Sequence, residues 1–110
     1  MTVEYIRYRI DADRRDAFVA AYREAATALD DSEYCLGYQL AQCEEEPDRF
    51  ILRISWTSTA DHLNGFRTSA QFRRFLPPIR PYVDGIEEMQ HYQVVDGLDS
   101  DPSAASRRAT

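Results

Sequence analysis

The sequence has no lysine, and it has only two cysteines, four glycines and one tryptophan among its 110 residues. All thirteen basic residues are arginine, which we attribute to the codon usage of a GC-rich genome. Without lysine, no glycine-rich phosphate loop with a following lysine can form. The patterns G-x-S-x-G, C-x-x-C and H-x-x-x-H are also missing, so we expect no nucleophile elbow, redox cysteine pair or common zinc motif.

Long apolar runs are missing as well. No run approaches the roughly 20 residues that a membrane-spanning helix needs. The N-terminal "VEYIRYRI" lacks the apolar core of a signal peptide, so we expect a cytoplasmic protein. A formal net charge of −6 argues against binding to nucleic acid or to an anionic membrane surface, because both favour clustered cations.

The cysteines and histidines do not predict a cofactor site. Cys35 and Cys43 lie in one expected strand, which would hold them roughly 26 Å apart, too far for a disulfide. We therefore expect buried, reduced thiols. His62 and His91 lie on different elements without a carboxylate or cysteine at ligand spacing, so we predict no metal site.

Periodicity predicts one domain, residues 1–96, followed by a disordered tail, residues 97–110. Alternating segments predict strands, and an alanine-rich segment without Gly or Pro predicts a helix over 13–30. Two short helices follow the third strand, and Pro77 and Pro78 should end or kink the second. The expected strands cover residues 3–10, 34–43, 50–56 and 86–95.

This order, β-α-β-β-α-α-β, predicts an α+β fold of the ferredoxin-like, split βαβ type with a four-stranded antiparallel sheet. The rows expected to face the helices are apolar, and they include Leu36, Tyr38 and Leu40. The opposite rows mix apolar residues with arginines that Glu87 or Glu88 could pair. We predict a homodimer that pairs sheet to sheet, and the alternative is a monomer with a solvated sheet face. The mixed rows contain Val3, Tyr5, Arg7, Arg9, Ile51, Arg53, Met89 and Val95.

The segment "ISWTSTADHLNGFRTSAQFRRFL", residues 54–76, contains four aromatic residues and His62 within 23 positions. Trp56, Phe66, Phe72 and Phe75 are either core or the walls of a pocket, and the pattern leaves both interpretations open. His62 is expected at a partly exposed helix position. His91 is expected in the hydrogen-bond network of the dimer face.

The same segment, together with "IEEMQHYQVV", resembles the antibiotic biosynthesis monooxygenase (ABM) domain over about residues 3–96. The shared features are a strand that ends in Trp56, a short helix around 60–66, and a Ser-x-x-Phe start of the next helix at Ser69 to Phe72. The resemblance implies a dimeric α+β barrel. It also implies oxygenation of an aromatic, polyketide- or quinol-like molecule without a metal, flavin or haem cofactor.

Such a reaction needs an apolar pocket with a few hydrogen-bond donors. The resemblance assigns no catalytic residue, and it implies that Arg67 or a tyrosine hydroxyl stabilises a substrate anion. The substrate-binding residues that we predict on this basis are Tyr8, Tyr38, Trp56, Phe66, Arg67, Phe72 and Tyr92.

The sequence also departs from the family pattern. Many members carry a histidine three residues before the Ser-x-x-Phe serine, where this chain has Phe66. The related haem-degrading enzymes use an asparagine, a tryptophan and a histidine. This chain has Ile6, Phe66 and Leu76 at the matching positions, so haem degradation is not expected. The alternative function is a non-catalytic accessory barrel that binds a small hydrophobic ligand or a protein partner, in which the aromatic residues would interdigitate without a cavity.

Overall fold

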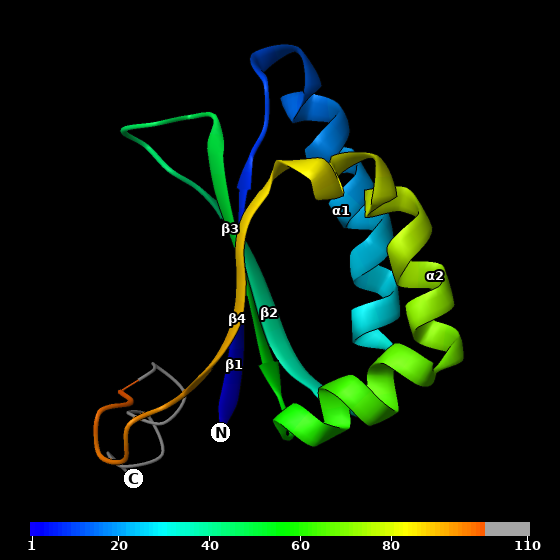
Figure 1. The fold of residues 1–110 in the computed structure, drawn as a ribbon, viewed down its shortest axis with the longest axis vertical. Coiled ribbons are helices and arrows are strands. Elements are labelled where there is room, and N and C mark those ends of the chain that lie inside the picture. The colour runs from blue at the N-terminus through cyan, green and yellow to red at the C-terminus, as the bar shows by residue number, and fades with distance from the viewer. Residues whose placement is uncertain (101–110) are drawn as a thin grey trace, which may run out of the picture.

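Four antiparallel strands and two helices form the fold in the computed structural model, which describes residues 1–100 (Figure 1). The strand order β2-β3-β1-β4 is that of the predicted ferredoxin-like sheet. Residues 101–110, most of the predicted tail, lie outside the described residues. No helix within residues 1–100 is both long and apolar enough to cross a bilayer. The elements are β1 (Thr2–Arg9), α1 (Arg15–Asp30), β2 (Cys35–Gln42), β3 (Arg49–Trp56), α2 (Ala70–Ile79) and β4 (Ile86–Gln93).

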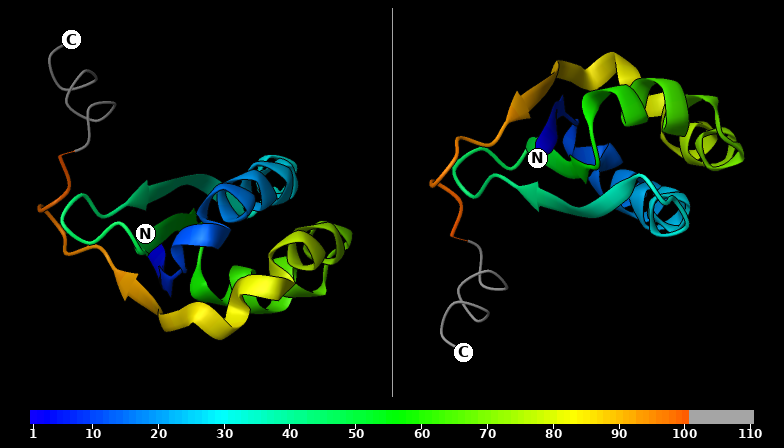
Figure 2. Two further views of the ribbon diagram at one scale, coloured as in Figure 1. Left: turned by 90° about the horizontal axis from the view of Figure 1, so that it is seen from above. Right: turned by 90° about the horizontal axis from the view of Figure 1, so that it is seen from below.

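Both helices cover the same face of the sheet, and within residues 1–100 no helix covers the other face (Figure 2). Alternation along the central strand β1 turns Glu4, Ile6 and Tyr8 toward the helices. The register places His91 of β4 opposite Glu4, so both side chains project from the same sheet face. A short π-helical turn, η2 (Asp61–Gly65), and a 3-10 turn, η3 (Phe66–Thr68), connect β3 to α2.

Helix α1 packs an aromatic stripe onto the sheet, as its periodicity predicts. The ring of Phe18 meets the rings of Tyr8 and Phe50 at 4.9 Å between centroids. The hydroxyls of Tyr8 and Tyr22 form a buried hydrogen bond. Burial raises the pKa of Tyr8 to about 12, so its hydroxyl keeps its proton at neutral pH. Each buried ring of this kind contributes about 1.5–3 kcal/mol relative to an exposed one.

Helix α2 contains Pro77 and Pro78 and ends one residue later, at Ile79, close to where the prolines were expected to end or kink it. Each proline removes only its bond to the carbonyl four residues earlier. Those carbonyls belong to Arg73 and Arg74, which are exposed, so water can replace the lost bonds. Ser69 begins the helix as predicted, because its hydroxyl accepts a hydrogen bond from the backbone N–H of Phe72.

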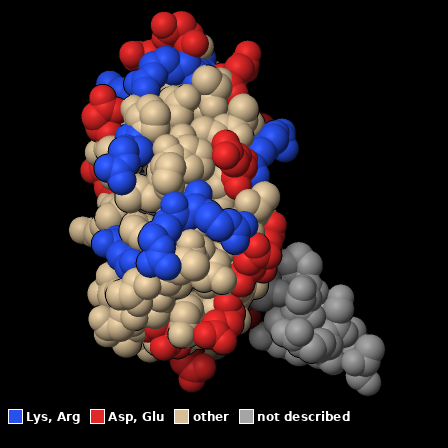
Figure 3. Space-filling view, turned by 90° about the vertical axis from the view of Figure 1, so that its right-hand side faces the viewer, with Lys and Arg blue, Asp and Glu red and all other residues tan. Residues whose placement is uncertain are grey.

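The uncovered sheet face carries the expected ion pairs. Arg7 pairs with Glu88 and Arg9 with Glu87, each at 3.6 Å. Tyr5 packs edge-on against Tyr92 at 5.3 Å between ring centroids. The helix-covered side also carries charges of both signs, with a band of arginine across its middle (Figure 3).

Several expected positions differ in the structure. Met89 pairs with Ile6 and therefore projects to the helix side, not to the uncovered face. Leu36 is 58% exposed, because the register shifts between Cys35 and Gly37 and takes it out of the expected row. Tyr38 is 36% exposed, because β2 is an edge strand that the helices cover only in part. Cys35 and Cys43 are free thiols, as expected, but both are only half-buried.

Candidate active site

A pocket of about 250 Å³ lies between the sheet and α2. Its walls are almost entirely aromatic and aliphatic, and they come from β1, β3, β4, α2 and the η2–η3 segment. Arg67, Val83 and Met89 are the exposed members of its lining. Small-molecule sites are concave and mainly apolar, with a few convergent polar groups. The polar members of this pocket are therefore the ones that could perform chemistry.

Five of the seven predicted substrate-binding residues line this pocket. They are Tyr8, Trp56, Phe66, Arg67 and Phe72.

The other two lie elsewhere. Tyr38 lines a separate groove of about 540 Å³ between α1 and β2, and its hydroxyl donates to Asp30 at 2.9 Å. Tyr92 pairs with Val3 on the uncovered face, where its hydroxyl donates to Glu88 at 2.6 Å. One sheet cannot bring residues of both faces into one pocket, so the grouping of Tyr92 with the pocket residues is wrong.

Glu4 is the buried carboxyl group of the pocket, with 2% of its surface exposed. Its Oε1 accepts a hydrogen bond of 3.1 Å from Nε1 of Trp56. Burial raises the pKa of Glu4, while the Trp56 hydrogen bond and the charge of Arg67 act in the opposite direction. Glu4 is not among the site residues predicted from the sequence. Its alternation with Ile6 and Tyr8 does indicate that it lies on the same face of the strand as these apolar residues.

His62 lies beside Glu4 and is 3% exposed, so the prediction of a partly exposed residue is wrong. Its ring stacks on Trp56 at 4.3 Å between centroids and an interplanar angle of 11°. Burial, followed by the charges of Arg67 and His91, lowers the pKa of His62 to about 3. The ring is therefore neutral at physiological pH.

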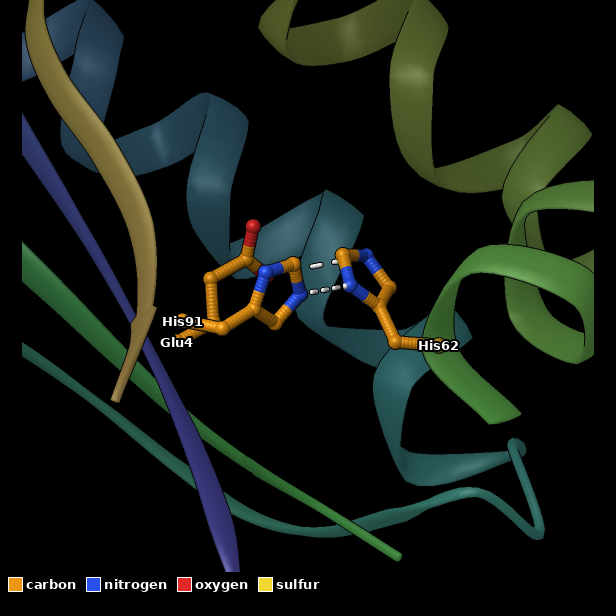
Figure 4. Close-up of side chains that lie close together, drawn as sticks. All are labelled: Glu4, His62 and His91. Carbon is orange, nitrogen blue, oxygen red and sulfur yellow. Dashed lines mark hydrogen bonds and ion pairs between the residues drawn. The ribbon is translucent and has the colours of Figure 1, made fainter. Parts of the chain in front are cut away.

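His91 completes a chain of three polar side chains (Figure 4). His62 Nε2 lies 3.6 Å from Glu4 Oε1, and His62 Nδ1 lies 2.7 Å from His91 Nε2. Burial and the charge of Arg67 lower the pKa of His91 too. The expected place of His91 in the dimer face is wrong, because its register partner Glu4 projects to the helix side.

The local sequence explains how His62 reaches this position. Ser58 caps the turn, since its hydroxyl accepts from the backbone N–H of Asp61 at 2.9 Å. Gly65 closes the π-helical turn against the ring of Tyr34, where an added Cβ would stand 2.7 Å from ring carbons. Single π-helical turns occur frequently at functional sites.

Within residues 1–100, the three side chains are also the one group whose ligand atoms lie close enough to hold a metal ion, within 4.8 Å of one another. The expectation that the histidines lack a carboxylate neighbour is therefore wrong. The arrangement still fits an ion poorly, because His62 meets its two neighbours through different ring nitrogens. Two nitrogens on one zinc ion also stand about 3.0–3.4 Å apart, wider than the 2.7 Å between His62 and His91. The contacts are those of a polar chain, in which His62 and His91 share a hydrogen bond and Glu4 lies 3.6 Å from His62.

Comparison with known proteins gives one family. The pattern of the family "Antibiotic biosynthesis monooxygenase" (ABM) matches residues 1–77. The uncharacterized protein YczJ of Bacillus subtilis (strain 168) is 26% identical over 78 residues, which is 71% of this chain and 82% of YczJ.

Solved structures share the fold. A protein from Bordetella bronchiseptica, described as a candidate antibiotic biosynthesis monooxygenase, has a TM-score of 0.71 and 24% identity, covering 86% of this chain and 96% of that one. A protein from Chloroflexus aurantiacus with the same description has a TM-score of 0.69 and 22% identity, covering 89% and 96%. The family match spans more than half of the residues, and it includes Glu4, Trp56 and His62. The chain therefore belongs to the antibiotic biosynthesis monooxygenase family.

Proposed function

We propose that the protein is a monooxygenase that oxidises a small phenol or quinol without a prosthetic group. The observation that carries this proposal is the largely apolar pocket in which Glu4 and His62 lie 3.6 Å apart and the charge of Arg67 acts on both, a group that forms the polar end of the pocket. Family membership supports the reaction type. The alternative of an accessory barrel with tightly interdigitated aromatic residues is disfavoured by the pocket of about 250 Å³.

The volume of the pocket indicates the size of the substrate. An apolar cavity of about 150 Å³ accommodates benzene, which has six non-hydrogen atoms. By the same ratio, 250 Å³ accommodates roughly ten such atoms. We therefore favour a one- or two-ring quinol over a larger polyketide-like molecule.

The polar end can generate the reactive form of such a substrate. Ionised Glu4 takes the proton of the substrate hydroxyl, and Arg67 stabilises the resulting anion. The electron-rich anion reduces oxygen directly. Overall, one quinol and one O₂ give one hydroxyquinone and one water, and the quinol supplies all four electrons. The protein contributes binding, deprotonation and charge stabilisation.

Oxygen uptake by the purified protein tests the proposal. One- and two-ring hydroquinones and larger anthrones are supplied without added cofactor, with and without a chelator. We expect uptake with the small quinols, and a fall of 10²–10⁴-fold in Glu4→Gln, which keeps an acceptor for Trp56 but loses the base. Phe66→Ala should raise the Michaelis constant, because it removes a pocket wall.

Gln39→Ala on the edge strand β2, outside the pocket, is the matched control. Equal uptake by wild type and Glu4→Gln would reject Glu4 as the base. Tight binding of a quinol with no uptake would identify a ligand-binding barrel without catalysis.

We also propose that two chains pair through their uncovered sheet faces. Tyr5 of β1 and Tyr92 of the edge strand β4 form an aromatic patch on that face, next to the pairs of Arg7 with Glu88 and Arg9 with Glu87. Aromatic and arginine side chains are enriched in protein interfaces. A sheet-to-sheet dimer would cover this patch and leave both pockets on the outside of the pair.

A further inference from the structure

The proposed reaction needs a route for protons, because its base is buried. A phenol that enters neutral and reacts as its anion leaves one proton in the pocket, and one proton is needed again when water forms. Glu4 and His62 line the pocket, and both are nearly inaccessible to solvent. His91 lies outside the pocket lining, is half-buried, and belongs to the edge strand β4.

We propose that Glu4, His62 and His91 form a proton-transfer chain that connects the closed end of the pocket with the edge of the sheet at β4. The inference rests on the proposed function for its substrate. Its geometry is independent of that function, since it consists of three side chains in series from β1, η2 and β4 (Figure 4).

The atoms define the steps of an outward transfer. Glu4 Oε1 gives its proton to His62 Nε2, His62 Nδ1 gives its proton to His91 Nε2, and His91 Nδ1 gives one to water. One proton enters the chain and one leaves it, so the charge of the chain is unchanged. Inward transfer consists of the same three steps in the opposite direction. The contact between the histidines, at 2.7 Å, is already within hydrogen-bond range. The contact between Glu4 and His62, at 3.6 Å, must shorten by about 0.7 Å.

The electrostatic surroundings favour this transfer. The groups that face the chain are Trp56 from β3 and Arg67 from η3. The positive charge of Arg67 and burial hold both imidazoles neutral, and a neutral imidazole has the one donor and one acceptor nitrogen that each step uses. Burial raises the pKa of Glu4 and lowers that of His62 to about 3, so the proton is held by Glu4 and neutral His62 relays it through its two ring nitrogens.

Binding of 4-nitrophenol tests the chain without turnover. This probe has ten non-hydrogen atoms, and its anion absorbs visible light. Rapid mixing in weak buffer with a pH indicator then records anion formation and proton release separately. We expect His91→Gln to slow proton release by about tenfold or more, and added imidazole to restore it, because a diffusible base replaces the missing one. Gln93→Ala, on the same strand and the same sheet face, should match wild type.

The outcomes separate the chain from the proposed function. Proton release at the wild-type rate in His91→Gln would overturn the chain. If the wild type does not bind 4-nitrophenol as its anion, the anion site of the proposed function is rejected. The proton-transfer chain is then tested separately by the ¹⁵N resonances of the histidine rings. In that case His91→Leu should change the protonation pattern of the His62 ring nitrogens, and an unchanged His62 spectrum would reject the chain.

Discussion

The two faces of the sheet handle charge in opposite ways. The helix-covered face carries Glu4, His62 and His91 in one largely buried polar series, in which the two histidines share a hydrogen bond and Trp56 donates to Glu4 and stacks on His62. The uncovered face carries arginines and glutamates in pairs whose side chains remain 30–58% exposed. Water screens the pairs on the uncovered face, but it hardly reaches the buried series.

This difference shows that buried and exposed charged groups make different energetic contributions in a small domain. An exposed pair contributes about 0–1 kcal/mol whichever residues form it. A buried carboxyl group between a tryptophan and a histidine costs desolvation, so its presence needs another reason. The proposed role of Glu4 as the base would supply that reason, since perturbed pKa values concentrate at functional sites.

The largest expected effect is the loss of Trp56, which is fully buried and donates to Glu4. Trp56→Ala should lower the free energy of unfolding by about 3–5 kcal/mol, because it opens a cavity and removes the donor of a buried carboxyl group. Urea unfolding followed by circular dichroism measures this. The matched change on the uncovered face, Tyr92→Ala, should cost less than about 1 kcal/mol at concentrations where both proteins are monomeric. Equal losses would remove the distinction between the two faces.

The free energy of unfolding should fall in acid because His62 is buried in its neutral form. The folded-state pKa of His62 is about 3, below its unfolded value of 6.5, so the unfolded state binds the proton first as the pH falls. The stability that neutral His62 provides is therefore present above pH 6.5 and is lost between pH 6.5 and 3, with a slope of up to about 1.4 kcal/mol per pH unit. Glu4 has the opposite sign, because its pKa is raised and it stabilises the fold on protonation.

Variants separate the two contributions. His62→Gln should flatten the loss of stability between pH 6.5 and 3, measured by chemical unfolding at each pH. Glu4→Gln should be more stable than wild type at neutral pH, and this advantage should shrink in acid. An unchanged slope in His62→Gln would mean that His62 does not titrate in this range.

The sequence predicts the fold well because its periodicities are local. Alternation in 3–10 and the helical spacing in 13–30 each determine one element, and their order then leaves few sheet topologies. The inclusion of both prolines in α2 was harder to predict, because the exposed positions of Arg73 and Arg74 that allow it depend on tertiary structure. The coverage of Tyr38 depends on how far α1 reaches over an edge strand, and that of Leu36 depends on a register shift between strands, and neither is a local property.

The site could be predicted only in part, because it depends on pairing between distant residues. The aromatic walls, such as Trp56 and Phe66, follow from apolar patterns, and five predicted residues do line one pocket. The polar chain depends on the register that places His91 opposite Glu4 and on a π-helical turn that brings His62 to them. Alternation places Glu4 on the same strand face as Ile6 and Tyr8, but no pattern in the sequence indicates the turn that brings His62 to it.

The proposed dimer provides a third test of the uncovered face. Tyr92→Arg would place a further cation beside the exposed pair of Arg7 and Glu88, where unpaired charge at an interface is unfavourable. We expect the dissociation constant of the dimer to rise by at least about tenfold, equivalent to 1.4 kcal/mol. Analytical ultracentrifugation over a dilution series measures it, and Val83→Arg at the pocket is the control. A wild-type protein that remains a monomer at high concentration would reject the dimer.

The smallest effect is expected for the exposed ion pairs. Arg9→Ala removes the contact with Glu87 at 3.6 Å and the one with Asp48 at 3.7 Å, but the arginine side chain is 52% exposed. Its loss should change the free energy of unfolding by less than about 0.5 kcal/mol at 0.15 M salt and at concentrations where the protein is monomeric, because solvent then screens both contacts. Thermal unfolding at low and high salt measures this, with Arg73→Ala, exposed on α2, as the control. A loss above 2 kcal/mol would show that Arg9 is desolvated in the folded protein in solution, as it would be if a second chain covered the face in the proposed dimer.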